Sequence, residues 1–338
     1  MLDPIAWIEA HFELQQSNAA EFWYDRMASQ SGCNLPVIYY PFDGRRAGDF
    51  ADRGQILDFA AVAGDGRVLD FGPGDGWPSL PMAAHVAEVV GVDGSPRRVE
   101  VCRQNAERLG IANAHFVHVA PGDALPFADA SFDGATAASS VEQTPDPRAT
   151  LRELYRVLKP DARLRMHYES LNYYRGRAEC ELALGDAETG CSRLLIMDRR
   201  IDAKYVQQYG FLFDLSRAEL QTLLAPVGEQ LSCAALTPTV LATLRAHTLQ
   251  SVTWKTQHPS CRIWLRWLHE AGFQAARPTH DGGLFARRLY DRLPEAQRPS
   301  DLAAADGLLK PLVEVVVALE APPISVPGEW EPWITATR

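Results

Sequence analysis

The sequence predicts an α/β protein built on a doubly wound, seven-stranded and mostly parallel sheet. Three observations predict this fold. From residue 67 onwards, short apolar runs alternate with helical stretches, the pattern of parallel strands joined by right-handed helical crossovers. A glycine-rich turn at 71–76 links the first run to the first helical stretch. The alternation breaks after Glu169 and resumes at Ile263, so the sheet domain is expected to contain an insertion.

The parallel strands are expected where apolar residues cluster in short runs, at 67–71, 88–93, 115–119, 132–138 and 164–168. The helices between them are expected at 79–86, 95–109 and 147–158. Pro96 lies in the first turn of its helix, where a missing N–H group costs nothing. Lys159-Pro160 ends the last of these helices, because the residue before a proline disfavours helical backbone.

Two further strands are expected to close the sheet as an antiparallel C-terminal hairpin. They flank Asp281-Gly282-Gly283, a composition typical of a hairpin turn. A helix at 263–271, closed by Gly272, precedes them.

These patterns divide the chain into four parts. Residues 1–60 are expected to form a helical cap or lid, with a helix from about Phe50 to Val62. Residues 61–169 and 257–291 form the α/β core. Residues 170–256 are interpreted as a mainly helical insertion that contributes the lid and the substrate pocket. Residues 292–338 are expected to form a C-terminal helix and a proline-rich tail.

Composition and charge limit the function classes. Forty-three acidic against thirty-three basic residues give a net charge of −10, whereas a nucleic-acid-binding protein needs a basic surface. No apolar stretch approaches the about 20 residues that span a membrane, and the N-terminus has no basic residue before Arg26, unlike a signal peptide. The six scattered cysteines form no CxxC pair, so we expect reduced thiols in a cytoplasmic protein and no metal site.

The turn Gly72-Pro73-Gly74-Asp75-Gly76 indicates a ligand site. Glycines let the backbone approach a ligand closely, and the following helix N-terminus offers free N–H groups. A dinucleotide site requires GxGxxG, and its third glycine would fall on Trp77. The spacing is GxGxG instead, which weighs against a nicotinamide-dependent oxidoreductase.

This turn resembles the first motif of class I S-adenosylmethionine-dependent methyltransferases, in which an acidic residue and then GxGxG follow the first strand. Later segments resemble the family in the same order. Asp93 ends the second strand, Gly122-Asp123-Ala124 follows the third, and Ser131-Phe132-Asp133 enters the fourth. The segment 154–160 precedes the fifth strand, and 269–273 lies where the family's last helix meets its closing hairpin.

The resemblance implies a Rossmann-like fold with S-adenosyl-L-methionine as cofactor and S-adenosyl-L-homocysteine as product. It implies that Asp70 accepts hydrogen bonds from the amino group of the cofactor, Asp93 from the ribose hydroxyls and Asp123 from the adenine amine. The residues expected to bind the cofactor are Asp70, Gly72, Pro73, Gly74, Gly76, Trp77, Asp93, Gly94, Asp123, Ala124 and Ser140.

Three residues are candidates for a catalytic role, which would be to remove a proton from the methyl acceptor. Glu142 follows the fourth strand and His167 ends the fifth, so both are expected at the edge where open α/β sheets bind ligands. Tyr40 lies in a loop expected to fold over the cofactor. For each of the three, a purely structural role is the alternative.

The predicted function is methyl transfer to an O, N, S or C nucleophile of a small molecule, by a monomer or homodimer that binds neither nucleic acid nor membranes. The (Asn/Asp)-Pro-Pro-(Tyr/Phe) motif of nucleic-acid and protein methylases is absent after the fourth strand. A protein of this fold with different chemistry, or a non-catalytic cofactor-binding subunit, is the main alternative. An RNA or protein methyltransferase and an oxidoreductase are less favoured.

Overall fold

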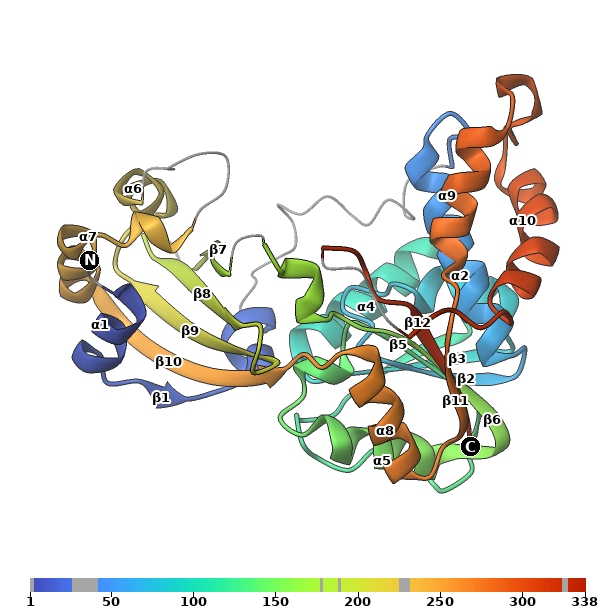
Figure 1. The fold of residues 1–338 in the computed structure, drawn as a ribbon, viewed down its shortest axis with the longest axis horizontal. Coiled ribbons are helices and arrows are strands. Elements are labelled where there is room, and N and C mark those ends of the chain that lie inside the picture. The colour runs from blue at the N-terminus through green and yellow to red at the C-terminus, as the bar shows by residue number, and fades with distance from the viewer. Residues whose placement is uncertain (1–2, 26–41, 177–178, 188–189, 225–231, 324–327) are drawn as a thin grey trace. The chain divides into compact units, whose positions relative to one another are not determined.

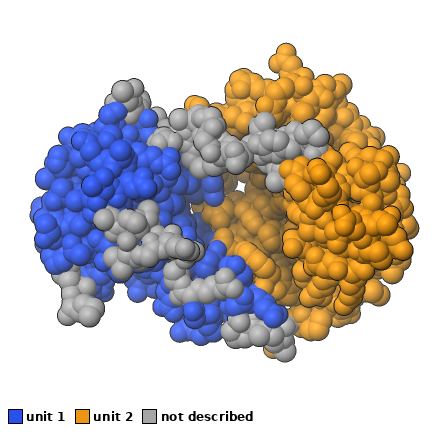
Figure 2. All heavy atoms as spheres, turned by 90° about the horizontal axis from the view of Figure 1, so that it is seen from above, with its two compact units in different colours: residues 1–29, 171–258, 327–329 blue, residues 30–170, 259–326, 330–338 orange. Residues whose placement is uncertain are grey.

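The computed structural model describes residues 3–25, 42–176, 179–187, 190–224, 232–323 and 328–338, which divide into two compact units (Figure 2). The first unit draws on residues 1–29, 171–258 and 327–329. The second draws on residues 30–170, 259–326 and 330–338. The expected cap, residues 1–60, is therefore shared between the two units.

The second unit contains the predicted seven-stranded sheet, in the order β11-β12-β6-β5-β2-β3-β4 (Figure 1). Its five parallel strands contain the five predicted apolar runs, and β6 begins before its predicted start at 164, in a stretch with exposed residues. Their bounds are Arg67–Phe71 (β2), Glu88–Asp93 (β3), Ala114–His118 (β4), Phe132–Ala138 (β5) and Leu158–His167 (β6).

The sheet closes with an antiparallel pair, as predicted, but one of the two strands is not where the sequence indicated. β11 (Gln274–Thr279) pairs with β12 (Trp333–Thr337), and β12 lies between β11 and β6. The expected hairpin turn is wrong. Asp281 accepts a hydrogen bond from the Gly283 N–H and caps helix α9 (Gly282–Arg292), so the chain continues as a helix there. The tail expected at 292–338 supplies the missing strand.

Helices cover the sheet in separate apolar clusters. α5 (Pro147–Val157) and α8 (Cys261–Ala271) share one cluster with the sheet, while α2 (Ala47–Ala63), α3 (Ser79–Met82) and α4 (Pro96–Leu109) share another. α9 and α10 (Leu302–Val316) pack on α2. A Cβ on Gly54 would come within 2.6 Å of the Gly282 carbonyl oxygen, so glycine at that point lets the α2 and α9 backbones approach closely.

The insertion is not mainly helical, which corrects the prediction. Residues 170–256 contain four strands, and β1 (Gln15–Gln16) adds a fifth, in the order β1-β10-β9-β8-β7. The strands are β7 (Cys180–Asp186), β8 (Ser192–Arg200), β9 (Tyr205–Phe213) and β10 (Thr248–Gln257). The prediction failed because β8 is buried along nearly its whole length and shows no alternation. In β9, however, the aromatic residues at 209, 211 and 213 do have the spacing of a strand.

Three helices pack beside this second sheet in the first unit: α1 (Pro4–His11), α6 (Arg217–Leu223) and α7 (Pro238–Ala246). Asp3 caps α1 through hydrogen bonds from the N–H groups of Ile5 and Ala6. Cys180 and Cys233 form a disulfide, so the expectation that all cysteines are reduced is wrong for this pair. The two residues are 53 positions apart, and no spacing motif in the sequence indicated that they pair.

A fully buried ion pair joins the helical layer of the second unit to its sheet. The Arg165 guanidinium in β6 donates to both carboxylate oxygens of Asp58 in α2, at 2.7 and 2.8 Å, and neither side chain is exposed. Arg165 also donates to Thr335 Oγ1 in β12, at 3.1 Å, and to the His280 carbonyl, at 2.9 Å. Asp58 accepts a further bond from the Gly282 N–H at 2.7 Å. The pair thus connects β6, β12, α2 and α9.

We expect Asp58→Ala to lower the free energy of unfolding by about 3–5 kcal/mol, because it leaves a guanidinium buried and unpaired. Urea unfolding followed by tryptophan fluorescence measures the change. Glu270→Ala is the matched control: it breaks the exposed pair with Arg148, whose side chains are 40% and 52% exposed. That change is expected to cost less than about 1 kcal/mol. Equal losses in the two variants would contradict the importance of the buried pair.

Candidate functional site

The glycine turn has the backbone that its sequence requires. It follows β2, and Gly72, Gly74 and Gly76 have φ values of 77°, 59° and 112°, in the left-handed region that favours glycine. A Cβ on Gly72 would lie 2.3 Å from the Ser140 Cβ, so no side chain fits there. A Cβ on Gly74 would meet only the Arg98 Nη1, at 3.9 Å. The turn is therefore closed against β5 at Gly72 and open at Gly74.

Asp93 and helix α4 hold the turn in this shape. Asp93, at the end of β3, accepts hydrogen bonds from the Gly74 N–H at 3.1 Å and from the Ser95 N–H at 2.9 Å. In α4, the Cys102 thiol donates to the Gly74 carbonyl, and the Asn105 amide donates to the Asp75 carbonyl at 2.8 Å. The sequence analysis missed these α4 contacts, although residues 98, 102 and 105 have the spacing of one helix face.

Asp70 supports the turn from inside the protein. It is fully buried and accepts hydrogen bonds from the hydroxyls of Ser79 and Thr136. Burial raises the pKa of this carboxyl to about 7, and those two hydrogen bonds lower it in part. Asp70 therefore connects β2 to the start of α3 and to β5. Its expected contact with the amino group of a cofactor stays a prediction.

The other predicted cofactor residues meet at one edge of the sheet, because the carboxyl ends of its parallel strands lie together. Asp93 and Gly94 follow β3, Asp123 and Ala124 are exposed in the loop after β4, and Ser140 follows β5. The Ser140 hydroxyl donates to the carbonyl of Phe71, beside the glycine turn.

Two residues of the turn are directed into the protein. Pro73 is buried beside Gly91 of β3, and the Trp77 ring packs edge-on against Phe59 of α2, with 5.8 Å between ring centroids. Trp77 is thus part of the apolar layer between α2 and the sheet.

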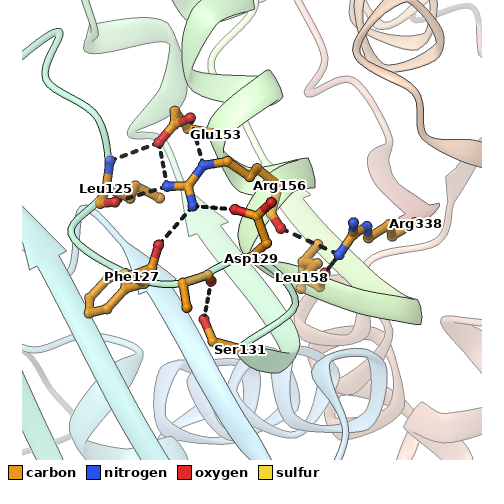
Figure 3. A network of polar contacts seen from close by, with 9 residues as sticks. Leu125, Phe127, Asp129, Ser131, Glu153, Arg156, Leu158 and Arg338 are labelled. Carbon is orange, nitrogen blue, oxygen red and sulfur yellow. Dashed lines mark hydrogen bonds and ion pairs between the residues drawn. The ribbon is translucent and has the colours of Figure 1, made fainter.

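Arg156 of α5 fixes the loop that carries Asp123 (Figure 3). Its guanidinium donates to the carbonyls of Leu125 and Phe127, at 2.9 and 2.7 Å, and pairs with Glu153 and Asp129. Glu153 in turn accepts from the Leu125 N–H at 2.8 Å. Four loop and helix groups are therefore bonded to the Arg156 side chain, which holds the loop against the end of the sheet.

The catalytic candidates differ in their surroundings. Glu142 is fully buried: Oε1 accepts from the Glu169 N–H at 2.7 Å, and Oε2 has no hydrogen-bond partner among the described residues. Burial raises its pKa to about 8, so this carboxyl is mostly neutral at pH 7. These surroundings favour a role in positioning β5 against β6. Tyr40 lies outside the described residues.

His167 lies at the carboxyl end of β6 and is paired with Ser139. Its Nδ1 is 3.0 Å from the Ser139 hydroxyl, and its carbonyl accepts from the Ser139 N–H at 2.9 Å. Ser139 has a φ of 51°, an uncommon backbone conformation for a residue other than glycine that often marks functional positions. Burial lowers the pKa of His167 to about 4, so its imidazole is neutral at pH 7.

Two tryptophans complete the surroundings of His167, and the sequence analysis did not find them. The rings of Trp333 and Trp330 lie 5.0 and 6.2 Å from the His167 ring. Both belong to the segment that β12 brings beside β6. Ser139 is next to the predicted residue Ser140, whereas the tryptophans carried no local signal, because their place depends on pairing across the whole core.

Among the described residues, no group of three or more His, Cys, Asp and Glu side chains could hold a metal ion. In that same part of the chain, every helix is too short or too polar to cross a membrane.

Part of the core matches a known family model. Residues 69–166 match a family model described as "Methyltransferase domain". The uncharacterized methyltransferase YcgJ of Bacillus subtilis is 36% identical over 119 residues, which are 35% of this chain and 47% of that protein. The ubiquinone/menaquinone biosynthesis C-methyltransferase UbiE of Geotalea daltonii is 37% identical over 105 residues, 30% of this chain and 45% of that protein. The chain thus spans less than half the length of these curated relatives.

Solved structures give similar matches. The crystal structure of YcgJ from Bacillus subtilis is 27% identical, covers 43% of this chain and 73% of its own, and has a TM-score of 0.33. The CcbJ methyltransferase from Streptomyces caelestis is 12% identical, covers 88% of this chain and 98% of its own, and has a TM-score of 0.48.

We expect the stability of the protein to fall as the pH rises from about 4.5 to about 8, partly because of Glu142. Its folded pKa of about 8 exceeds the ordinary value of 4.5, so the unfolded chain releases this proton first and is stabilised relative to the folded state as the pH rises. Asp70 acts in the same direction up to about pH 7.

Glu142→Gln removes one of these two groups and keeps an oxygen for the Glu169 N–H. The unfolding free energy of this variant is expected to fall less steeply with pH than that of the wild type. The two slopes should differ by up to about 1.4 kcal/mol per pH unit. Urea unfolding at a series of pH values measures both slopes. Parallel curves would contradict the raised pKa.

Proposed function

We propose, because residues 69–166 match a methyltransferase domain, that this chain transfers a methyl group from S-adenosyl-L-methionine to an O, N, S or C nucleophile of a small molecule. The observation that carries the proposal is the glycine turn. Its three glycines have left-handed φ values, Asp93 and α4 hold it, and the position of a Cβ on Gly74 is open.

The described residues fit this cofactor. The open face at Gly74 admits its amino-acid part. Asp93 accepts two backbone hydrogen bonds, and a carboxylate has about four acceptor sites, so it can also accept from the ribose hydroxyls. The exposed side chain of Asp123 suits the adenine amine. The product S-adenosyl-L-homocysteine would use the same contacts.

The chain's own task in the reaction is to position the acceptor and to take its proton. S-adenosyl-L-methionine supplies an electrophilic methyl group when bound. His167 is neutral at pH 7 and can therefore accept a proton, as a weak base, and its Nδ1 faces the Ser139 hydroxyl, which leaves Nε2 for the acceptor. Trp330 and Trp333 add apolar surface beside this ring, which helps to exclude water from the reacting atoms.

A small-molecule acceptor is supported by two observations. Relatives of the core include UbiE of Geotalea daltonii, which is named for a C-methylation in ubiquinone and menaquinone biosynthesis. The net charge of −10 disfavours a polyanionic acceptor such as nucleic acid.

We expect Asp93→Ala to weaken the binding of S-adenosyl-L-homocysteine by about 10- to 100-fold, the effect of losing hydrogen bonds to a charged group. Isothermal titration calorimetry measures the dissociation constant. Glu100→Ala removes an exposed carboxylate from α4 and should leave the affinity unchanged. If the Asp93→Ala protein binds S-adenosyl-L-homocysteine with wild-type affinity, Asp93 does not contact the ligand.

The reaction itself is tested with methyl-labelled cofactor and a small-molecule cell extract. The wild type is expected to transfer label to a compound of the extract, and Asp93→Ala to transfer far less. If the protein binds S-adenosyl-L-homocysteine but labels nothing, the non-catalytic alternative replaces this proposal.

Comparing Gly74→Ala with Gly110→Ala distinguishes two effects of an added Cβ: backbone strain and loss of space for a cofactor. Gly74 and Gly110 both have left-handed φ values, 59° and 68°, so alanine at either position should cost about 1–2 kcal/mol of stability. Only Gly74→Ala is expected to weaken the binding of S-adenosyl-L-homocysteine, at least tenfold by our estimate, because its Cβ enters the open face of the turn. Thermal unfolding and calorimetry measure the two effects. Equal binding by both variants would mean that the turn faces no ligand.

A further inference from the structure

The α/β unit contains a cavity apart from the glycine turn. Its volume is about 470 Å³, within the range of pockets that bind small organic molecules. None of the predicted cofactor or catalytic residues lines it. Helices α2 and α3, the C-terminal end of α4 with the loop that follows, and the start of α10 form its walls.

Most of the cavity wall is apolar. Ile56 and Leu80 are buried in it, whereas Leu109 and Leu302 line it with 41% and 45% of their surface exposed. A ligand that covers these exposed leucines is stabilised by about 25 cal/mol for each Å² of apolar surface removed from water. The wall therefore suits a ligand with an apolar body.

The charged residues of the wall are paired, with one exception. Asp49 forms an ion pair with Arg46 at 2.7 Å and accepts from the Asp43 N–H at 2.9 Å. Arg53 forms an ion pair with Asp306 and contacts the His85 ring.

Asp52 is the exception. Within the part of the chain that the structure describes, its carboxylate has no hydrogen bond and no ion pair, although it is only partly exposed in an apolar wall. Burial and the neighbouring Asp49 raise its pKa, and among the described residues no cation lowers it. The cavity thus carries one uncompensated negative charge, which a cationic ligand would neutralise.

We propose that this cavity is a second ligand site, for a molecule with a protonated amine on an apolar body. Asp52 accepts hydrogen bonds from the ammonium group, and the leucine-lined wall covers the body. A hydrogen bond between two charged groups is about twice as strong as one between neutral groups, so the amine distinguishes this ligand from neutral molecules of the same shape. The proposal is independent of the methyl-transfer function.

Phenylbutylamine and its uncharged counterpart phenylbutanol test the site by isothermal titration calorimetry with the full chain. We expect the amine to bind one molecule per chain, about tenfold more tightly than the alcohol, the size of one charged hydrogen bond. Saturating S-adenosyl-L-homocysteine should leave the affinity for the amine unchanged. Equal binding of the two probes, or competition with S-adenosyl-L-homocysteine, would overturn the proposal.

Three variants locate the site. Asp52→Asn should weaken amine binding about tenfold and leave the alcohol unaffected. Glu107→Gln, which removes an exposed charge from α4 outside the cavity, should change neither. Ala84→Trp, at an exposed position of the wall, should fill the cavity and abolish both. Circular dichroism confirms that each variant is folded. Wild-type amine binding by Asp52→Asn, or by a folded Ala84→Trp protein, would refute the site.

Discussion

The α/β unit depends on the buried pair of Arg165 and Asp58. Neither charge is exposed, and removing two charges from water costs several kcal/mol unless every donor and acceptor is satisfied. Partners from β12 and α9 satisfy them, so the pair is favourable only when the sheet has closed and α2 is in place. His167 lies two residues beyond Arg165 on the same strand, and Trp333 packs beside both. The positions of His167 and Trp333 at the end of β6 thus depend on the buried pair of Arg165 and Asp58.

The parallel sheet and the glycine turn could be predicted because their signals are local. Each strand contains a short apolar run, and the GxGxG spacing permits left-handed backbone at positions 72, 74 and 76. Parallel pairing then brings Asp93, the loop of Asp123 and Ser140 to the same edge, so the residues of the candidate cofactor site followed from the topology. Their roles toward a ligand depend on side-chain contacts that the pattern does not contain, as the burial of Asp70 and Glu142 illustrates.

The remaining features depend on contacts between residues far apart in the chain. The strand at 333–337 is recognised only through its pairing with β6, and the tryptophans beside His167 come with it. Asp281-Gly282-Gly283 suited a hairpin and a helix start equally well, and packing against Gly54 selected the helix. In the insertion, burial on both faces concealed the strand period in β8. The disulfide between Cys180 and Cys233 joins residues that no motif relates.

The position of β12 has a consequence for biosynthesis. Among the described residues, β11 pairs with no strand other than β12, and β6 has β12 as its neighbour on that side. While the ribosome is still making the residues before 333, β11 has no partner and β6 presents an open edge with unpaired backbone groups. Such edges are templates for association with other chains. The nascent protein therefore passes through a stage at which chaperones that cover strand edges would protect it from aggregation.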